Sequence, residues 1–229
     1  MKILIYTPSF YPKVGGLETV NYLIAQGLSK HFELTVVTPV LEDDNDHCYS
    51  FRIIRTKSVF VLLKEYMKCN LFVHSVLSLK GILPLVIWPK KKWVAIHHTC
   101  YFRVWDKDET LSSKLKKFMS RFSHNICVSD AVAKSLELKD YTVIHNSYNN
   151  SLFHNNGQEK RDGFVFVGRL VTEKGIDILI EAYQIYLKSS LKKQKLYIVG
   201  DGPMMETCKR LAAKSIQNGD IIFKGLLGG

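Results

Sequence analysis

The alternation of short apolar runs with segments of helical periodicity constrains the fold of this 229-residue chain more than any other feature of its sequence. Runs typical of strands buried in a parallel sheet lie at Ile3–Ile5, Leu34–Val37, Phe51–Ile54, Leu71–Val73, Val94–Ile96, Ile126–Val128 and Thr142–Ile144. Apolar residues recur at helical spacing in residues 17–28, 112–122 and 129–138. Because strands that alternate with helices form helix-covered parallel sheets, residues 1–150 are predicted to form a doubly wound α/β domain.

A second α/β pattern follows a segment without periodicity. Residues 146–163 are rich in asparagine, glycine and charged residues, which is typical of a linker. The sequence then predicts the strands Phe164–Val167, Leu196–Val199 and Ile221–Phe223, and helices at 176–187 and 204–213. A doubly wound domain usually has about five or six strands. We therefore expect residues 164–229 to form only the first half of a second domain, with an open edge at its last strand.

Composition and charge narrow the class of partner. Apolar residues make up 46% of the chain and charged residues 23%, the balance of a soluble globular protein. The 32 basic residues exceed the 21 acidic ones, and the net charge of +11 is spread over both parts of the chain. A basic surface attracts the phosphate groups of nucleotides, nucleic acids or anionic lipids. No nucleic-acid-binding signature is present, so nucleic acid is not expected as a partner.

The cysteine content and the length of the apolar runs indicate the cellular compartment in which the protein is expected. Five cysteines with wide spacing and no CxxC pair argue against a disulfide framework and a structural zinc site. The longest apolar runs, Val59–Leu63 and Ile82–Trp88, are far shorter than the ~20 residues of a membrane-spanning helix. The N-terminal apolar stretch is too short for a signal peptide and runs into Pro8. We expect a cytoplasmic protein with reduced thiols.

Two loops between a predicted strand and a predicted helix are candidates for binding phosphate. Gly15 and Gly16 precede the first helix, where glycines let a ligand approach the backbone and the helix amides favour an anion. Arg169 and Lys174 lie before a helix that starts near Gly175, and two cations at a helix N-terminus suit a diphosphate. The alternatives are a tight turn for the glycines, which form no GxGxxG fingerprint, and solvated surface charges for the cations.

Further candidates lie at other strand ends. Gly200 and Gly202 of the sequence GDGP suit a turn into a helix, and a Walker loop is excluded because GK[ST] is absent. His97 and His98 end a strand at the carboxyl edge, where open α/β sheets bind ligands, and a histidine there can accept a hydrogen bond or move a proton. Adjacent strand residues point to opposite faces, so at most one of the two histidines faces a cleft.

Two remaining patterns concern metals and membranes. The DxD sequences at 44–46 and 106–108 supply paired carboxylates of the kind that hold a divalent cation beside a diphosphate. No neighbouring pattern supports them, so no metal is expected. The sequence WPKKKW at 88–93 combines lysines with tryptophans, which suits an anionic membrane surface. The alternative is a solvated basic turn.

The order of these segments resembles family 4 of the glycosyltransferases, enzymes of the GT-B type with two facing Rossmann-like domains. The resemblance rests on KILIYTPSFYPKVGGLETV (2–20), ICVSDAVAKSL (126–136), VIHNSYNNSLF (143–153), FVGRLVTEKGIDILIEAY (166–183) and LYIVGDGP (196–203). In the third segment, Ser147 and Asn149 stand where the family usually has glycine and aspartate. The resemblance implies a complete acceptor-side Rossmann-like domain over 1–150 and the first half of a donor-binding Rossmann-like domain over 164–229.

The family transfers a sugar from a nucleotide-sugar donor to an acceptor with retention of configuration, usually without a metal or other cofactor. By resemblance, Gly15 and Gly16 would approach the donor phosphate or the acceptor. Arg169 and Lys174 would neutralise the leaving diphosphate, where negative charge develops during transfer. The implied acceptor is a polysaccharide or a lipid-linked glycan, which fits a protein at the inner face of a membrane.

The resemblance also assigns roles to the other strand-end residues. Gly200 and Gly202 would let the donor lie close to the backbone. His97 matches the strand-end histidine of the family best and His98 second, with the implied role of a hydrogen bond to the donor sugar or the reacting region.

One element of the family pattern has no counterpart in the chain. The donor domain of the family carries two glutamates after a loop rich in glycine and proline, and no glutamate pair here has that context. Three interpretations follow. The chain is a shortened glycosyltransferase with little or no activity of its own, or half of a split enzyme that another chain completes. The third is a non-catalytic protein that binds nucleotide phosphates or a membrane surface.

Overall fold

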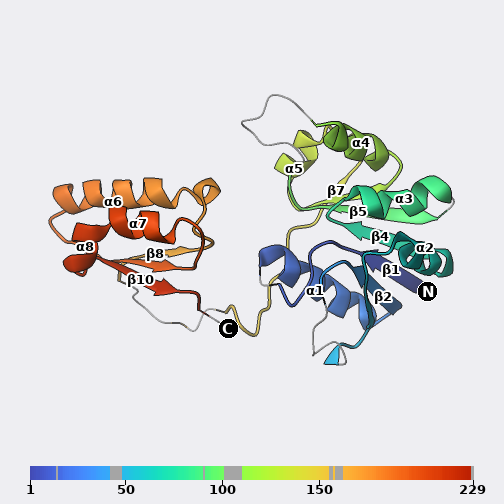
Figure 1. Cartoon of the computed structure of the whole chain (residues 1–229), viewed down its shortest axis with the longest axis horizontal. Coiled ribbons are helices and arrows are strands. Elements are labelled where there is room, and N and C mark those ends of the chain that lie inside the picture. Colours follow the sequence, from blue (N-terminus) through green and yellow to red (C-terminus); the bar gives the residue numbers. More distant parts are fainter. Residues whose placement is uncertain are drawn as a thin grey trace. The chain divides into compact units, whose positions relative to one another are not determined.

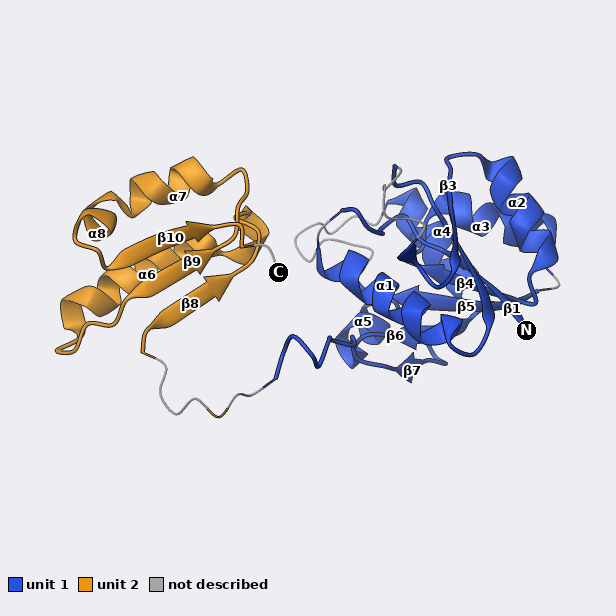
Figure 2. Ribbon diagram, turned by 90° about the horizontal axis from the view of Figure 1, so that it is seen from below, with its two compact units in different colours: residues 1–154 blue, residues 155–229 orange. Residues whose placement is uncertain are grey.

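The computed structural model describes residues 1–13, 15–41, 48–89, 91–100, 110–154, 157 and 162–227. The chain divides into two compact units, Met1–His154 and Asn155–Gly229, which we call unit 1 and unit 2 (Figures 1 and 2). The division falls within the asparagine-rich segment at 146–163. Each unit has its own sheet and its own core and is described by itself.

Unit 1 is built on a seven-stranded parallel sheet in the order β3-β2-β1-β4-β5-β6-β7. The strands are β1 (Lys2–Tyr6), β2 (Glu33–Thr38), β3 (Arg52–Arg55), β4 (Leu71–Ser75), β5 (Lys92–His97), β6 (His124–Cys127) and β7 (Thr142–Val143). The sheet grows in one direction from β1 to β3 and in the other from β4 to β7. The topological switch point therefore lies between β1 and β4, and the predicted doubly wound α/β fold is confirmed.

Five helices connect these strands (Figure 1). They are α1 (Gly16–Ser29), α2 (Val59–Lys68), α3 (Leu79–Ile87), α4 (Leu111–Ser120) and α5 (Asp130–Ser135). All but α1 begin after a serine or threonine whose side chain accepts a hydrogen bond from the amide three residues on: Ser58, Ser78, Thr110 and Ser129. Each cap satisfies one of the amides that the first turn leaves unpaired.

Helices α2 and α3 are not among the elements predicted from the sequence. They contain the apolar run at 59–63 and all but the last residue of the run at 82–88, and α3 also has Pro84 in its interior. An apolar run without polar interruptions shows no helical periodicity, so its pattern does not distinguish a helix from a buried strand. In the structure, α2 and α3 pack against each other and close one core of unit 1.

Side-chain alternation along β1 builds two cores, one on each face of the sheet. Ile3 and Ile5 belong to a cluster that includes residues of α1. Leu4 and Tyr6 belong to a second cluster, which includes residues of α2 and α3. Because β1 is buried on both faces, its apolar run is continuous rather than alternating.

Unit 2 has a three-stranded parallel sheet in the order β10-β9-β8. Its elements are β8 (Phe164–Val167), the 3-10 helix η2 (Thr172–Lys174), α6 (Ile176–Ser189), β9 (Leu196–Val199), α7 (Met205–Leu211), α8 (Ala213–Gln217) and β10 (Ile221–Gly225). The helix predicted at 204–213 is instead two short helices that meet at Ala212. One core joins α6 and α7 to one face of the sheet, while Val165 and Val167 of β8 are exposed.

Two further observations concern the whole described chain. No helix within the described ranges is both long and apolar enough to cross a bilayer. All five cysteine thiols are free. Burial raises the pKa of the Cys127 thiol to about 11, so this thiol stays protonated at neutral pH.

Candidate functional site

A hydrogen-bonded cluster of polar side chains lies at the topological switch point of unit 1. It comprises Thr7 after β1, Asn21 in α1, Ser75 at the end of β4 and His98 after β5. Asn21 Nδ2 donates to Thr7 Oγ1 at 2.9 Å, and Ser75 Oγ donates to Asn21 Oδ1. His98 Nε2 lies 2.9 Å from Ser75 Oγ. The cluster ties three strand ends to α1 at the edge where open α/β sheets bind ligands.

His98 is neutral at pH 7 and has a defined hydrogen-bonding pattern. Burial lowers its pKa to about 4, which the Asn146 side chain offsets only in part. Because the Ser75 hydroxyl donates its proton to Asn21, His98 Nε2 is the donor to Ser75. His98 Nδ1 makes no hydrogen bond within the described residues. With Nε2 as the donor, the buried Nδ1 is the acceptor nitrogen of the neutral ring.

The structure places the two histidines in different surroundings. His97, the first choice from the family resemblance, is fully buried on the opposite face of β5. Its Nε2 lies 2.8 Å from Asn125 Oδ1 in β6, and Asn125 Nδ2 donates to the carbonyl of Ser120 at the end of α4. Burial also lowers the pKa of His97. His97 therefore holds β5 to β6, and a direct contact between His97 and a ligand does not fit this burial.

Three members of the cluster, Thr7, Asn21 and Ser75, are not among the residues singled out from the sequence. Each is buried, and a buried polar side chain needs a hydrogen-bond partner. The signal in the sequence is a polar residue at a position where the surrounding pattern is apolar. Their partnership spans up to 54 positions and depends on the strand order, which the sequence pattern does not provide.

The predicted glycine loop forms the start of α1. Gly15 is the N-cap residue and Gly16 the first residue of the helix. A Cβ atom on Gly15 would overlap the carboxylate of Glu18, whereas the space around Gly16 is open. The Glu18 carboxylate therefore lies at the helix N-terminus, where negative charge is favourable. A ligand phosphate at this helix would have to displace Glu18.

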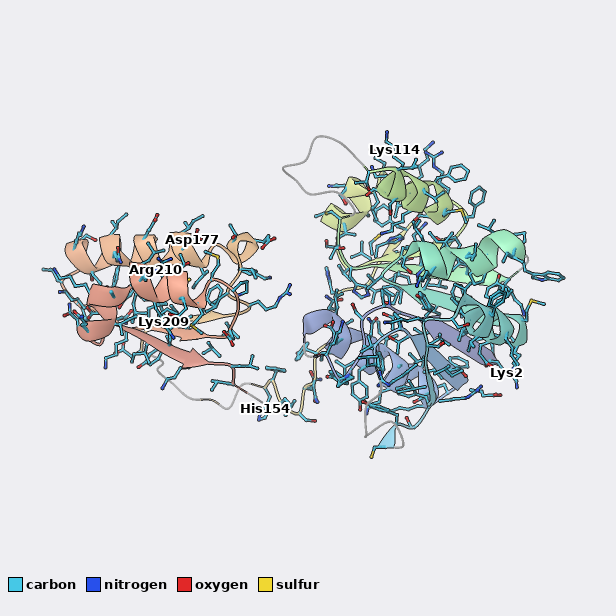
Figure 3. The ribbon with its side chains drawn as sticks, in the orientation of Figure 1. Lys2, Lys114, His154, Asp177, Lys209 and Arg210 are labelled. Carbon is cyan, nitrogen blue, oxygen red and sulfur yellow. The ribbon has the colours of Figure 1, made fainter. Side chains whose placement is uncertain are left out.

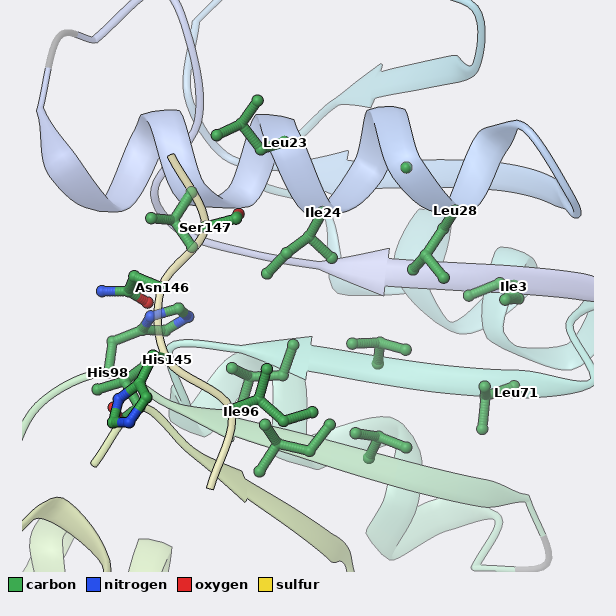
Figure 4. Close-up of a pocket in the computed structure, with 17 residues that line it drawn as sticks. Ile3, Leu23, Ile24, Leu28, Leu71, Ile96, His98, His145, Asn146 and Ser147 are labelled. Carbon is green, nitrogen blue, oxygen red and sulfur yellow. The ribbon is translucent and has the colours of Figure 1, made fainter. Parts of the chain in front are cut away.

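An apolar hollow of about 440 Å³ lies between α1 and one face of the unit 1 sheet (Figure 4). Figure 4 shows Ile3 and Leu71 at one end and His98, His145 and Asn146 at the other. The apolar walls offer no partner to a phosphate or a sugar hydroxyl. Only the end beside His98 can hold a polar group of a ligand.

In unit 2 the loop after β9 packs directly on the loop after β8. The amide of Leu170 donates to the carbonyl of Asp201 at 2.9 Å, and the amide of Met204 donates to the carbonyl of Leu170 at 3.0 Å. Gly200 and Gly202 have φ angles of 136° and 157°, and a Cβ on either would overlap the backbone of the facing loop. Both glycines are therefore required for the packing of the two loops, whatever their contact with a ligand.

Arg169 and Lys174 lie exposed on the first of these loops. Lys174 ends η2, and Gly175, with a left-handed φ of 62°, leads directly into α6. Neither cation forms an ion pair with a described residue. The acidic side chains of Glu173 and Asp177 are close in sequence and weaken the local positive field. Lys174 thus stands at a helix N-terminus, and both cations are available to an anion.

No metal site is visible in the described residues. Both DxD sequences, 44–46 and 106–108, lie outside them. Within the described ranges, no three histidine, cysteine, aspartate or glutamate side chains are grouped so that they could hold a metal ion.

The tryptophan- and lysine-rich segment at 88–93 is partly exposed, with Trp88 and Lys92 at the surface. Trp93 is buried in a core of unit 1. Lys91 Nζ donates to the carbonyls of Met67, at 3.1 Å, and Cys69 at the C-terminal end of α2. A cation there is favourable because the last carbonyls of a helix carry partial negative charge. Trp88 is exposed, and Lys90 lies outside the described residues.

Comparisons with known proteins bear on both units. Residues 148–227 match the family described as "Glycosyl transferases group 1". This range includes the described strands and helices of unit 2 and both of its packed loops. A search of curated proteins gave no significant match.

Solved structures resemble the chain over nearly its whole length. Anabaena HepE in complex with UDP is 16% identical, with a TM-score of 0.77 and coverage of 100% of this chain and 70% of HepE. The lipopolysaccharide outer core galactosyltransferase WaaB is 14% identical, with a TM-score of 0.60 and coverages of 100% and 69%. A glycosyltransferase from Rickettsia africae is 13% identical, with a TM-score of 0.70 and coverages of 99% and 68%.

Identities this low show the fold alone, and that fold is the GT-B type. Unit 1 provides a seven-stranded Rossmann-like sheet and unit 2 the three-stranded part of a second one. The chain therefore has the GT-B fold, and its residues 148–227 match the family described as "Glycosyl transferases group 1".

Proposed function

We propose that this chain transfers, or helps to transfer, a sugar from a nucleotide-sugar to a glycan or lipid-linked acceptor, with retention of configuration as in family 4. The observation that carries the proposal is the pair of exposed cations, Arg169 and Lys174, at the start of α6 in the segment that matches the family. HepE has been solved with UDP and with UDP-glucose, which makes UDP the first nucleotide to test.

Each site residue has a role that its surroundings support. Arg169 and Lys174 bind the diphosphate and stabilise the negative charge that develops on it as the sugar leaves. Neutral His98 lies at the polar end of the hollow, where its ring borders the sugar, while Ser75 and Asn21 hold the ring in place. Gly16 lets the acceptor or the donor approach the start of α1. The donor-side charge is thus supplied by side chains rather than by a metal ion.

A second candidate is a split enzyme, and one observation favours it. β8 is an edge strand in a sheet of three, and its Val165 and Val167 are exposed. An unpaired parallel edge with apolar side chains is a template for a further strand. If the protein is a split enzyme, the donor site is complete only when another polypeptide pairs with β8.

Isothermal titration of the full chain with UDP, GDP and ADP tests the proposal. We expect saturable binding of one nucleotide. The double variant Arg169→Ala, Lys174→Ala should weaken it by roughly a hundredfold or more, because charge-assisted hydrogen bonds contribute ~1.5–3 kcal/mol each.

The matched control is Lys188→Ala, Lys193→Ala, which removes two exposed cations of unit 2 away from the candidate loop. Equal losses in the two double variants would mean that nucleotide binding follows net charge only. A folded wild-type chain that binds none of the three nucleotides would rule out a donor clamp formed by this chain alone.

A further inference from the structure

Helix α4 buries polar side chains and exposes apolar ones, the reverse of the usual pattern for a helix that packs on a sheet. Its buried side chains are Ser113 and Ser120. Leu111 is 83% exposed and Phe122, just after the helix, is 67% exposed, with Leu115 and Phe118 also exposed between them. The spacing of these four residues places them in one stripe along the helix. α4 therefore turns an apolar stripe to the solvent.

Helix α3 adds to this apolar surface. Lys80 is its single charged residue, and its exposed residues are Leu79, Leu83, Val86 and Ile87, followed by Trp88. A helix that is apolar on all sides is normally covered on all sides. α3 contacts α4, as Figure 1 shows, and a largely apolar hollow of about 420 Å³ lies between Val86 and Phe122. We call these exposed apolar residues of the two helices, from Leu79 to Trp88 and from Leu111 to Phe122, the α3–α4 surface.

The charge on this surface has one sign. Residues 79–89 and 111–122 contain five basic residues and no acidic residue. Of these, Lys117 pairs with Glu137 at 3.3 Å, whereas Lys114 and Arg121 are exposed and lie beside the apolar stripe of α4. Figure 3 shows Lys114 directed away from the body of unit 1.

We propose that the α3–α4 surface docks the chain on an anionic lipid surface. Exposed leucine, phenylalanine and tryptophan side chains enter the boundary between lipid headgroups and acyl chains, and the flanking cations pair with anionic headgroups. A second copy of the chain is disfavoured as the occupant because it would place like charges against each other. The inference rests on the proposed function, since it states where a lipid-linked acceptor would be met.

Co-sedimentation of the full chain with vesicles tests the proposal. The probes are vesicles of phosphatidylcholine alone and vesicles of equal parts phosphatidylcholine and phosphatidylglycerol. We expect binding to the anionic vesicles and little to the neutral ones. The double variant Lys114→Gln, Arg121→Gln should weaken binding roughly 30-fold at low salt. Each basic residue near an anionic surface raises the affinity roughly fivefold. Phe118→Ser, Phe122→Ser should weaken it by a similar factor.

The matched controls are Lys188→Gln, Lys193→Gln for charge and Ile178→Ser, Ile185→Ser for exposed apolar area, all in unit 2. Equal vesicle binding by the α3–α4 variants and their controls would overturn the proposal. Self-association through this surface in place of vesicle binding would also overturn the proposal. In that case the wild-type chain would sediment as a dimer and bind no vesicles, and Phe118→Ser, Phe122→Ser would convert the dimer to a monomer. Nucleotide titration of the same variants separates this outcome from a failure of the donor site, because unit 2 is unchanged in them.

Discussion

Three histidines of unit 1 are kept neutral by burial. Burial lowers the pKa of His74 to about 3 and that of His98 to about 4, and it lowers the pKa of His97 as well. In the unfolded chain a histidine titrates near 6.5. Between these values the unfolded chain binds protons that the folded chain does not. The lowered pKa values of these histidines therefore make the free energy of unfolding of unit 1 fall in mild acid.

We expect the free energy of unfolding to be fully retained above about pH 6.5 and to fall as the pH drops toward 4. The slope should approach about 1.4 kcal/mol per pH unit for each such histidine. Urea denaturation at a series of pH values measures it. His98→Asn should remove the part of the slope that belongs to one proton. A wild-type stability that is constant across this window would contradict the assignment.

The shifted pKa of Glu65 affects stability mostly below the pH range of the histidines. The pKa of Glu65 is lowered, chiefly by its hydrogen bond with Lys68. Its contribution is therefore present above its ordinary value of 4.5 and is lost only at lower pH. The histidine window lies mostly above that range.

Two helical glycines of unit 1 differ in what surrounds them. A Cβ on Gly81 in α3 would overlap the buried rings of His74 and Tyr6, whereas no atom lies within 4 Å of a Cβ on Gly27 in α1. Alanine normally stabilises a helix interior relative to glycine. The helix α3 therefore depends on Gly81 for its distance from β4, while α1 does not depend on Gly27.

We expect Gly81→Ala to lower the free energy of unfolding by about 1–3 kcal/mol through overpacking. Gly27→Ala should raise it by about 0.5–1 kcal/mol. Chemical denaturation of the two variants beside the wild type checks both. If both variants raised the free energy of unfolding, helix propensity rather than contact with His74 would decide the outcome.

The elements of this fold differ in how much of them the sequence predicts. The strands of unit 1 are predictable because strands buried on both faces carry unbroken apolar runs, as β1 does. The helix α3 is not predictable in this way, because its unbroken apolar run is equally compatible with a helix and with a buried strand. Alternation shows that only one of His97 and His98 can face a cleft, but the pattern does not show that His97 is the buried one. The partnership of Asn21 with Ser75 requires the strand order as well.

At the scale of the whole molecule, the sheet of unit 2 has an exposed edge at β8. Its Val165 and Val167 are 66% and 73% exposed. Such an edge favours pairing with another polypeptide. We expect the chain to associate as its concentration rises, and Val165→Lys, Val167→Lys to reduce this association, as measured by sedimentation velocity over a concentration series.

The control for that experiment replaces an equal apolar area elsewhere. Ile178 and Ile185 on α6 are 68% and 66% exposed but belong to no strand edge. If Ile178→Lys, Ile185→Lys reduced association as much as the β8 variant, added charge would explain the effect and strand pairing would not.

The order of strands in unit 1 has a consequence for biosynthesis. β1 is synthesised before both of its partners, yet it is a central strand that pairs with β2 on one side and with β4, through Ile3 and Leu71, on the other. At about 5–20 residues per second, several seconds pass between the synthesis of β1 and that of β4. During that time a strand built to be buried on both faces has no partner on one side. The nascent chain therefore offers β1 as a binding segment for chaperones until β4 has emerged.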